Sequence, residues 1–295
     1  MSSFVQTFEA ALVAAAVYLL LGLAWNVVYR ACGYLNLAIG EVFILAGVLA
    51  AKLPERLGTD QPLIVGAAVV AVVAAGAWLA ERATLRPLRA RGEAAMLTTL
   101  GLGLLVGELA HRLAPEVALR TPPMVAGPPL RIAGAAVPRQ DLVIVAVALA
   151  AWATLAFLVT RTAAGRTVRA CADDRASARW LGIDLPRVET SAFVVSAVLA
   201  AVAAVVATPA IGVSAGSGTI LAVTSFLAVS LGGIGSDRGA IFGALAVALA
   251  EAFTARYWSS DVKELVVMVL LVVVLIARPA MTGTRIRPHR RDSVR

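Results

Sequence analysis

Long runs without any charged side chain dominate the chain. Residues 10–29, 61–80 and 142–160 contain no Asp, Glu, Lys or Arg, and one further charge-free run extends from residue 190 to residue 236. The hydrocarbon core of a bilayer is about 30 Å thick, and an α-helix needs roughly 20 apolar residues to cross it. Because runs of this length recur along the chain, the sequence predicts an all-α, polytopic helical membrane protein.

The apolar runs and the glycines, prolines and charges between them predict eight or nine transmembrane or re-entrant segments. Two of them, residues 33–52 and 219–234, are short or interrupted, which leaves the number at eight or nine. The predicted segments lie near residues 8–29, 33–52, 62–80, 94–114, 141–160, 189–210, 219–234, 238–256 and 263–278. We therefore expect one membrane domain over residues 1–281 and a basic, disordered tail over residues 282–295 that touches anionic lipid.

Composition removes several classes of function. The chain is 60% hydrophobic and 15% charged, whereas soluble domains have about 25% charged residues. Neither lysine lies in a G-x-x-x-x-G-K-[ST] phosphate loop, the two histidines form no H-E-x-x-H pair, and the two cysteines form no C-x-x-C pair. We therefore expect no enzymatic activity, no cofactor and no metal site in this chain.

Arginines set the expected orientation in the membrane. They gather in residues 81–93, in residues 161–188 and after residue 277. Loops rich in Lys and Arg lie on the cytoplasmic side of a membrane protein. This rule accounts for the formal net charge of +8 without nucleic-acid binding, and it places the amino terminus outside and the carboxy terminus in the cytoplasm.

One polar cluster lies inside an apolar segment. Asn36 and Glu41 fall within residues 33–52, next to Gly33 and Gly40. An acidic side chain at mid-membrane costs about 2.5–3.5 kcal/mol on insertion scales and normally faces the bundle or a wet cavity. One interpretation is a substrate pathway or gate; the other is a structural carboxylate paired with an arginine or a backbone amide.

A second cluster combines hydroxyl groups with small residues. Thr98 and Thr99 precede Gly103 and Gly107, whose G-x-x-x-G spacing lets two helices approach closely. We expect the glycines to serve packing and consider the threonines as additional groups of the substrate pathway.

The Gly- and Ser-rich residues 208–219 carry no charge. They fit a re-entrant segment that lines a cavity, because non-helical backbone is tolerated at membrane depth only where protein or water satisfies it. A plain external loop fits them equally well.

The 161–188 loop contains a predicted short helix outside the membrane. Asp173 or Asp174 can cap its start, Gly182 can end it, and Pro186 prevents its continuation. Trp180 would give it a small apolar surface. The helix either rests on lipid or fits a groove on another protein.

Several motifs together resemble the permease subunits of bacterial branched-chain amino acid ABC importers, specifically the smaller of the two permeases. The resemblance runs from about residue 8 to residue 283, in the order and spacing of that family. The motifs are GYLNLAIGE (33–41), RPLR (86–89), LTTLGL (97–102), residues 162–165, RACADDRASARWLGI (169–183), LGGIGS (231–236), residues 239–243 and Arg278-Pro279.

The resemblance implies a multi-pass subunit of the bacterial cytoplasmic membrane. Its implied partners are a second permease subunit, ATP-binding subunits, and a periplasmic or lipid-anchored solute-binding protein. The solute would be a branched-chain amino acid or another small polar solute such as urea or an amide. The substrate pathway would include Asn36, Gly40, Glu41, Thr98 and Thr99.

The resemblance also implies that the 169–183 region is the segment that couples the permease to the ATPase. The family's classical loop begins with Glu-Ala-Ala, whereas here Ala176-Ser177-Ala178 precedes the glycine. The predicted coupling residues are Asp173, Asp174, Arg175, Ala176, Arg179, Trp180, Leu181 and Gly182. The rival hypothesis is a stand-alone secondary transporter or channel, for which Glu41, Glu108 or Glu251 would serve as ion site.

Overall fold

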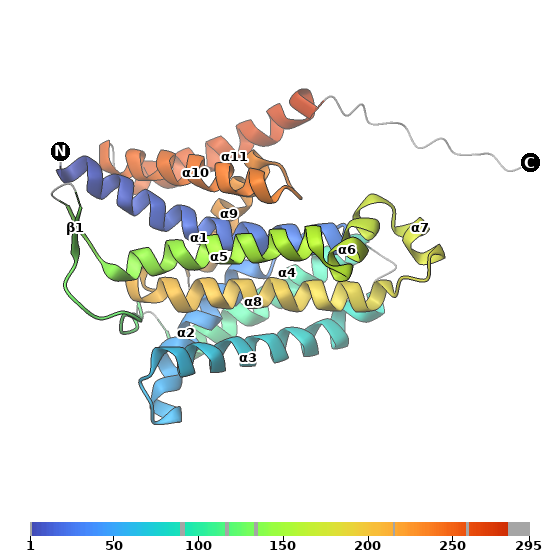
Figure 1. Ribbon diagram of the computed structural model, residues 1–295, viewed down its shortest axis with the longest axis horizontal. Coiled ribbons are helices and arrows are strands. Elements are labelled where there is room, and N and C mark those ends of the chain that lie inside the picture. The colour runs from blue at the N-terminus through green and yellow to red at the C-terminus, as the bar shows by residue number, and fades with distance from the viewer. Residues whose placement is uncertain are drawn as a thin grey trace, which may run out of the picture.

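The computed structural model describes residues 2–88, 92–115, 118–132, 135–214, 216–257 and 260–282. Figure 1 shows most of its helices side by side and roughly parallel to the longest axis of the molecule. The helices are α1 (Ser2–Cys32), α2 (Ile39–Leu57), α3 (Pro62–Ala80), α4 (Gly92–Leu113), α5 (Arg139–Arg161), α6 (Ala163–Asp173), α7 (Arg175–Trp180), α8 (Leu185–Ile211), α9 (Gly218–Gly232), α10 (Asp237–Tyr257) and α11 (Ser260–Thr282). A π-helical turn (Glu81–Leu85) and a 3-10 turn (Arg86–Leu88) follow α3, and two short antiparallel strands, β1 (Leu130–Ile132) and β2 (Ala135–Val137), precede α5.

Six helices of the described residues are long and apolar enough to cross a membrane: α1, α3 with its π-helical turn, α4, α5, α8 and α10. Each of the nine segments predicted from the sequence contains a helix, and the remaining three are α2, α9 and α11. The prediction of a polytopic helical membrane protein is therefore confirmed. The predicted start of the second segment was early, because residues 33–38 are not helical and α2 begins at Ile39.

The centre of the bundle consists of α1 and α8. Their apolar windows are 83% and 61% buried, against 22% or less in α3, α4 and α5. α8 supplies a dense series of small buried side chains, among them Ala200, Ala203 and Ala204. Small residues let helix backbones approach closely in a membrane protein, where packing supplies much of the association energy. The two central helices run antiparallel, with Val28 and Ala31 near the end of α1 in one cluster with Ala192 near the start of α8.

The helices α1–α3 and α8–α10 form an inverted repeat. In each half a long central helix is followed by a short connection and by a shorter helix that turns back. The third helix of each half then packs against the central helix of the other half, so that α3 lies on α8 and α10 lies on α1. Such repeats with opposite direction in the membrane are common in transporters, whose sites lie near the interface of the two halves.

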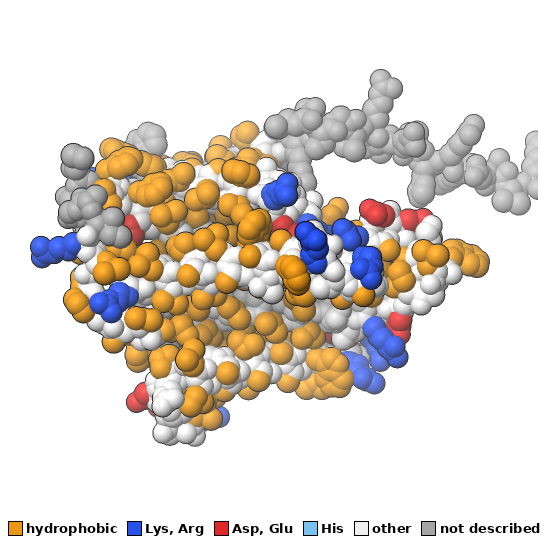
Figure 2. Space-filling view, in the orientation of Figure 1, with side chains coloured by type: hydrophobic (Ala, Val, Ile, Leu, Met, Phe, Trp, Pro, Cys, Tyr) orange, Lys and Arg blue, Asp and Glu red, His pale blue; other side chains and the backbone are white. Residues whose placement is uncertain are grey.

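Charged side chains lie at the two ends of the bundle. Figure 2 shows an apolar surface over the middle of the helices and Lys and Arg side chains at both ends, with the larger group at the end that carries α6 and α7. This distribution matches a bundle that crosses a bilayer with α6 and α7 outside the hydrocarbon region.

Candidate functional site

The connection between α1 and α2 is held against the middle of α4. The Leu37 amide donates to Thr99 Oγ1 over 3.1 Å, and Thr99 Oγ1 donates to the Met96 carbonyl over 2.7 Å. Asn36 is buried, and its Oδ1 accepts from the Ala38 amide over 3.1 Å, immediately before α2 begins. A side-chain oxygen at this place satisfies one of the amides that a helix start leaves without a partner. α2 therefore begins beside the interior of α4 rather than at its end.

The carboxylate of Glu41 lies between the starts of α2 and α9. Thr219 Oγ1 donates to Glu41 Oε1 over 3.0 Å. A Cβ atom on Gly218 would lie 2.5 Å from Glu41 Oε2, and one on Gly40 would lie 2.2 Å from the Gly218 carbonyl oxygen. Only glycine therefore fits at position 40, where the contact is with backbone, whereas a side chain at position 218 would displace the Glu41 carboxylate. Because the amino-terminal end of a helix carries a partial positive charge, both helix starts favour the negative charge of Glu41.

The glycines of α4 make room for this junction. A Cβ atom on Gly103 would lie 3.2 Å from Ala38 Cα, and one on Gly107 would lie 2.9 Å from Glu41 Oε2. The G-x-x-x-G pair thus packs against the start of α2, as its spacing predicts. Thr98 behaves differently from Thr99: its Oγ1 donates to the Ala94 carbonyl of its own helix over 2.7 Å and not to the residues around Asn36 or Glu41.

A cavity of about 250 Å³ opens beside Glu41. Its walls are mostly apolar, and Glu41 and Thr219 supply polar atoms at one side. The other lining residues are Trp25, Leu37, Leu100, Gly103, Leu104, Ala222, Val223, Phe226 and Leu271. A pocket with apolar walls and a few convergent polar groups is the usual form of a small-molecule site.

The other two carboxylates of the rival hypothesis lie elsewhere. Glu108 forms an exposed ion pair with Arg112 over 2.7 Å. Glu251 is buried in α10 and accepts a hydrogen bond from Tyr18 of α1.

The helix α7 forms an exposed tip beyond the ends of the long helices. Asp174 Oδ1 accepts from the Ala176 amide over 2.9 Å and caps the helix, and Gly182 ends the turn with φ of 78°. Hydrogen bonds from the Ser177 hydroxyl and from backbone amides lower the pKa of the Asp174 carboxyl. A lowered pKa keeps this cap ionised at neutral pH, and it is lost only as the pH falls through that lowered value. Trp180 and Leu181 are 89% and 78% exposed.

Arg175 fastens α7 to the membrane helices. Its Nη1 donates to the Ala31 carbonyl at the end of α1 over 2.6 Å, and its Nη2 forms an ion pair with Glu189 near the start of α8. Glu189 is 5% exposed as a whole residue, so the carboxylate of this ion pair is shielded from water, whereas the Arg175 side chain is partly exposed. Of the predicted coupling residues, Asp173, Asp174, Ala176, Arg179, Trp180, Leu181 and Gly182 are exposed and Arg175 is half-buried.

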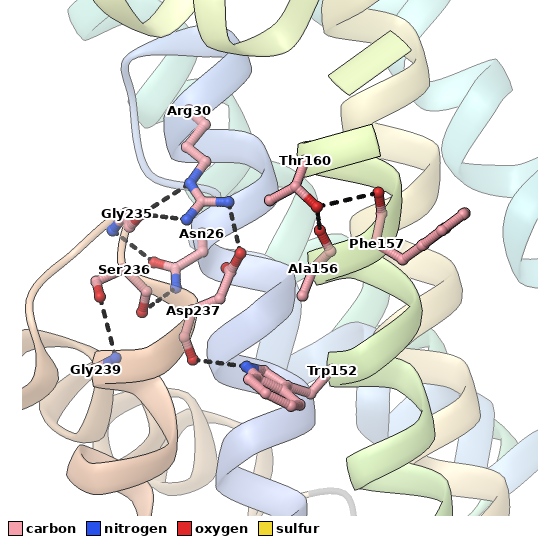
Figure 3. A network of polar contacts seen from close by, with 10 residues as sticks. All are labelled: Asn26, Arg30, Trp152, Ala156, Phe157, Thr160, Gly235, Ser236, Asp237 and Gly239. Atoms are coloured by element: carbon pink, nitrogen blue, oxygen red, sulfur yellow. Dashed lines mark hydrogen bonds and ion pairs between the residues drawn. The ribbon is translucent and has the colours of Figure 1, made fainter. Parts of the chain in front are cut away.

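A polar network joins the end of α1 to the turn between α9 and α10 (Figure 3). Arg30 Nε donates to the Gly235 carbonyl over 2.8 Å, and its Nη1 pairs with Asp237 Oδ2 over 2.8 Å. Asn26 Oδ1 accepts from the Gly235 amide over 2.7 Å, and Trp152 Nε1 donates to the Asp237 carbonyl over 3.1 Å. Sequence reasoning missed this network. Asn26 alone within a charge-free run was a signal for it, because an amide in hydrocarbon needs a partner.

These features define a polytopic permease with a mid-membrane polar junction and an exposed tip outside the bilayer. The chain matches the family described as branched-chain amino acid transport system / permease component over residues 7–275. It therefore belongs to this family, the membrane subunits of ABC transporters. This confirms the family expected from the sequence motifs, and it makes the chain a transport subunit rather than an enzyme.

Individual relatives agree with this assignment. The chain is 30% identical to the high-affinity branched-chain amino acid transport system permease protein LivH of Escherichia coli (strain K12), over 97% of this chain and 96% of LivH. It is also 30% identical to the corresponding BraD protein of Pseudomonas aeruginosa, over 97% of each chain. Among solved structures, PsaBC from Streptococcus pneumoniae in complex with Fab matches with a TM-score of 0.51 and 13% identity over 90% of both chains, which is a likeness of fold alone.

Proposed function

We propose that this chain forms half of the path by which an ABC importer carries branched-chain amino acids or similar small polar solutes across the bacterial cytoplasmic membrane. The observation that carries the proposal is the Glu41 junction, where two helix starts and a carboxylate meet beside an apolar cavity. An aliphatic amino acid offers an ammonium group for the carboxylate and an apolar side chain for the cavity walls. Asn36, Gly40 and Thr99 hold the junction together.

The proposed partners are a second permease subunit, ATP-binding subunits and a solute-binding protein. Purification from the native membrane in mild detergent, with mass spectrometry of the bound chains, tests this assembly. Recovery of an ATPase and a second permease is the expected result. Recovery of the chain alone, under conditions that hold another ABC importer together, would contradict it.

The proposed orientation places α6 and α7 in the cytoplasm and the α2–α3 connection outside. Both native cysteines are buried, and burial raises the pKa of the Cys171 thiol, which lowers the fraction of reactive thiolate. An introduced cysteine therefore reports on its own position. On intact spheroplasts, a membrane-impermeant maleimide is expected to label Asp60→Cys, whereas Ser177→Cys reacts only after permeabilisation. The reverse pattern would overturn the orientation.

The contacts also suggest how a movement driven by ATP hydrolysis would be transmitted to the Glu41 junction. Arg175 ties α7 to the end of α1, and Arg30 ties the same end of α1 to the start of α10 at Asp237. α9 ends just before the turn that leads to Asp237, and the start of α9 contacts Glu41. A shift of α7 would therefore displace α1 and α9 as connected bodies and change the distance between the starts of α2 and α9.

Replacement of Arg175 by leucine tests this connection. Removal of one partner from a buried ion pair costs about 3–5 kcal/mol, and because the Arg175 side chain is 36% exposed we expect roughly 2 kcal/mol of lost stability. The measurement is thermal unfolding of the purified permease, together with ATP hydrolysis by the assembled transporter. The control is Arg175→Leu with Glu189→Leu, which is expected to recover stability but not the stimulation of ATP hydrolysis by substrate. Full recovery of both would show a structural role only.

A further inference from the structure

A groove of about 630 Å³ lies between the end of α3 and the start of α8, away from the Glu41 junction. The π-helical turn Glu81–Leu85 forms one wall and the first turns of α8 form the other. π-helical turns inside α-helices are rare and occur frequently at functional sites. The groove lies at the same end of the bundle as α6 and α7, which the proposed orientation places at the cytoplasmic surface.

Three guanidinium groups line this groove, from Arg82, Arg86 and Arg187. Two carboxylates share it, and both already have partners: Asp184 Oδ2 pairs with Arg187 Nε over 3.0 Å, and buried Glu81 accepts a hydrogen bond from the Thr190 hydroxyl over 2.9 Å. The Arg82 guanidinium lies 5.2 Å from the centre of the Trp78 ring, within the range of a cation–π contact. The charges of Arg187 and Asp184 offset one another, and Arg82 and Arg86 together outweigh the single carboxylate of Glu81, so the groove has a net positive charge.

The other end of the groove is apolar and continues onto the outer surface of the bundle. Trp78 and Val195 are 43% and 39% exposed, and Val194 lies beside them. α3 is only 22% buried along its apolar window, so most of its surface faces outward. Tryptophan is enriched at the level of the lipid headgroups. The groove thus places guanidinium groups at the membrane surface and an apolar furrow immediately below them.

We propose that this groove binds an anionic phospholipid of the cytoplasmic leaflet, with its phosphate at Arg82 and Arg86 and an acyl chain along Trp78, Val194 and Val195. The negative charge of the lipid complements the guanidinium groups, and basic pockets between transmembrane helices on the cytoplasmic side recognise anionic headgroups. A headgroup in this groove would also contact the Ser191 hydroxyl. The site depends on the proposed orientation but not on the identity of the transported solute.

Native mass spectrometry of the purified, full-length permease tests the proposal by titration with phosphatidylglycerol and, separately, phosphatidylcholine. Two arginines near the surface contribute about 1 kcal/mol each, so Arg82→Gln with Arg86→Gln is expected to bind phosphatidylglycerol roughly 30-fold more weakly. Phosphatidylcholine, whose choline group offsets the charge of its phosphate, is expected to bind more weakly than phosphatidylglycerol to the parent protein and to lose much less affinity in this variant. The matched control is Arg161→Gln with Arg166→Gln, which removes the same charge from exposed positions of the same membrane face outside the groove and should bind as the parent protein does.

If both double variants lose the same affinity for phosphatidylglycerol, general surface charge explains the effect and the proposed site is wrong. Unchanged phosphatidylglycerol binding by Arg82→Gln with Arg86→Gln would also contradict the proposed lipid site. If this variant keeps lipid binding but loses a co-purified ATPase, the groove is a contact for another protein and the proposed lipid site is wrong. If the double variant does not fold, exposed Arg86→Gln alone is expected to weaken binding about 5-fold.

Discussion

Replacement of Trp180 by alanine is expected to weaken the association of the permease with its ATPase by about 100-fold, or roughly 3 kcal/mol. Trp180 is 89% exposed at the end of α7, where it contributes little to the fold of the permease alone. Large aromatic side chains buried at the centre of an interface contribute most of the binding energy. We therefore expect its loss to affect assembly and leave the thermal unfolding of the isolated permease unchanged. The measurement is co-purification and titration of the ATPase against the detergent-solubilised permease.

The matched control for Trp180 is Tyr257→Ala. Tyr257 is 68% exposed at the end of α10, far along the bundle from α7. Its replacement removes a comparable exposed aromatic side chain and should leave ATPase binding unchanged. If Trp180→Ala binds the ATPase normally but loses quenching by brominated lipid, α7 rests on the membrane surface instead and the coupling proposal is wrong.

The sequence was sufficient for the fold class because that part of the fold depends on local composition. A helix in lipid must satisfy its backbone internally, so charge-free runs of about 20 residues mark helices without knowledge of the packing. The short helix of the exposed tip was also predictable, since Asp174 and Gly182 mark its start and end at the positions that the structure shows.

The arrangement of the helices could not be predicted in the same way. The two shorter helices of the inverted repeat have different lengths, 19 residues in α2 and 15 in α9, and they share no motif. The contact between Glu41 and Thr219 joins positions 178 residues apart. The residues next to Glu41 and those next to Thr219 do not indicate this contact. The sequence therefore predicted a polar group at mid-membrane but not its hydrogen-bond partner.

Arg30 is a second residue whose contacts could not be predicted from the sequence. In the sequence Arg30 is only the charge that follows the charge-free run 10–29, whereas the structure gives it hydrogen bonds to Gly235 and Asp237. Gly235 has φ of 85°, a backbone conformation that residues with a side chain rarely adopt. In this conformation its backbone turns toward α1. The role of such a residue depends on a turn distant in sequence, and it becomes visible only when the two halves of the bundle are packed together.

Glu41→Gln is expected to lower solute uptake by the reconstituted importer by about 100-fold. The substitution keeps the size of the side chain but removes the charge that the Thr219 hydroxyl and two helix starts favour. Hydrogen bonds to charged groups contribute about 1.5–3 kcal/mol, and a helix start adds up to about 2 kcal/mol in a partly buried site, so roughly 3 kcal/mol is a reasonable total. Assembly with the ATPase and basal ATP hydrolysis should not change, because α7 is distant from the junction.

The kinetics of this variant separate two roles for Glu41. A carboxylate that binds the ammonium group of the solute affects mainly the KM for uptake, whereas one that only holds the starts of α2 and α9 together affects mainly the maximal rate. Glu55→Gln is the matched control, since Glu55 is exposed near the other end of α2. If uptake by Glu41→Gln equals that of the Glu55 variant, the charge of Glu41 has no role in transport, and the substrate path must be sought elsewhere in the bundle.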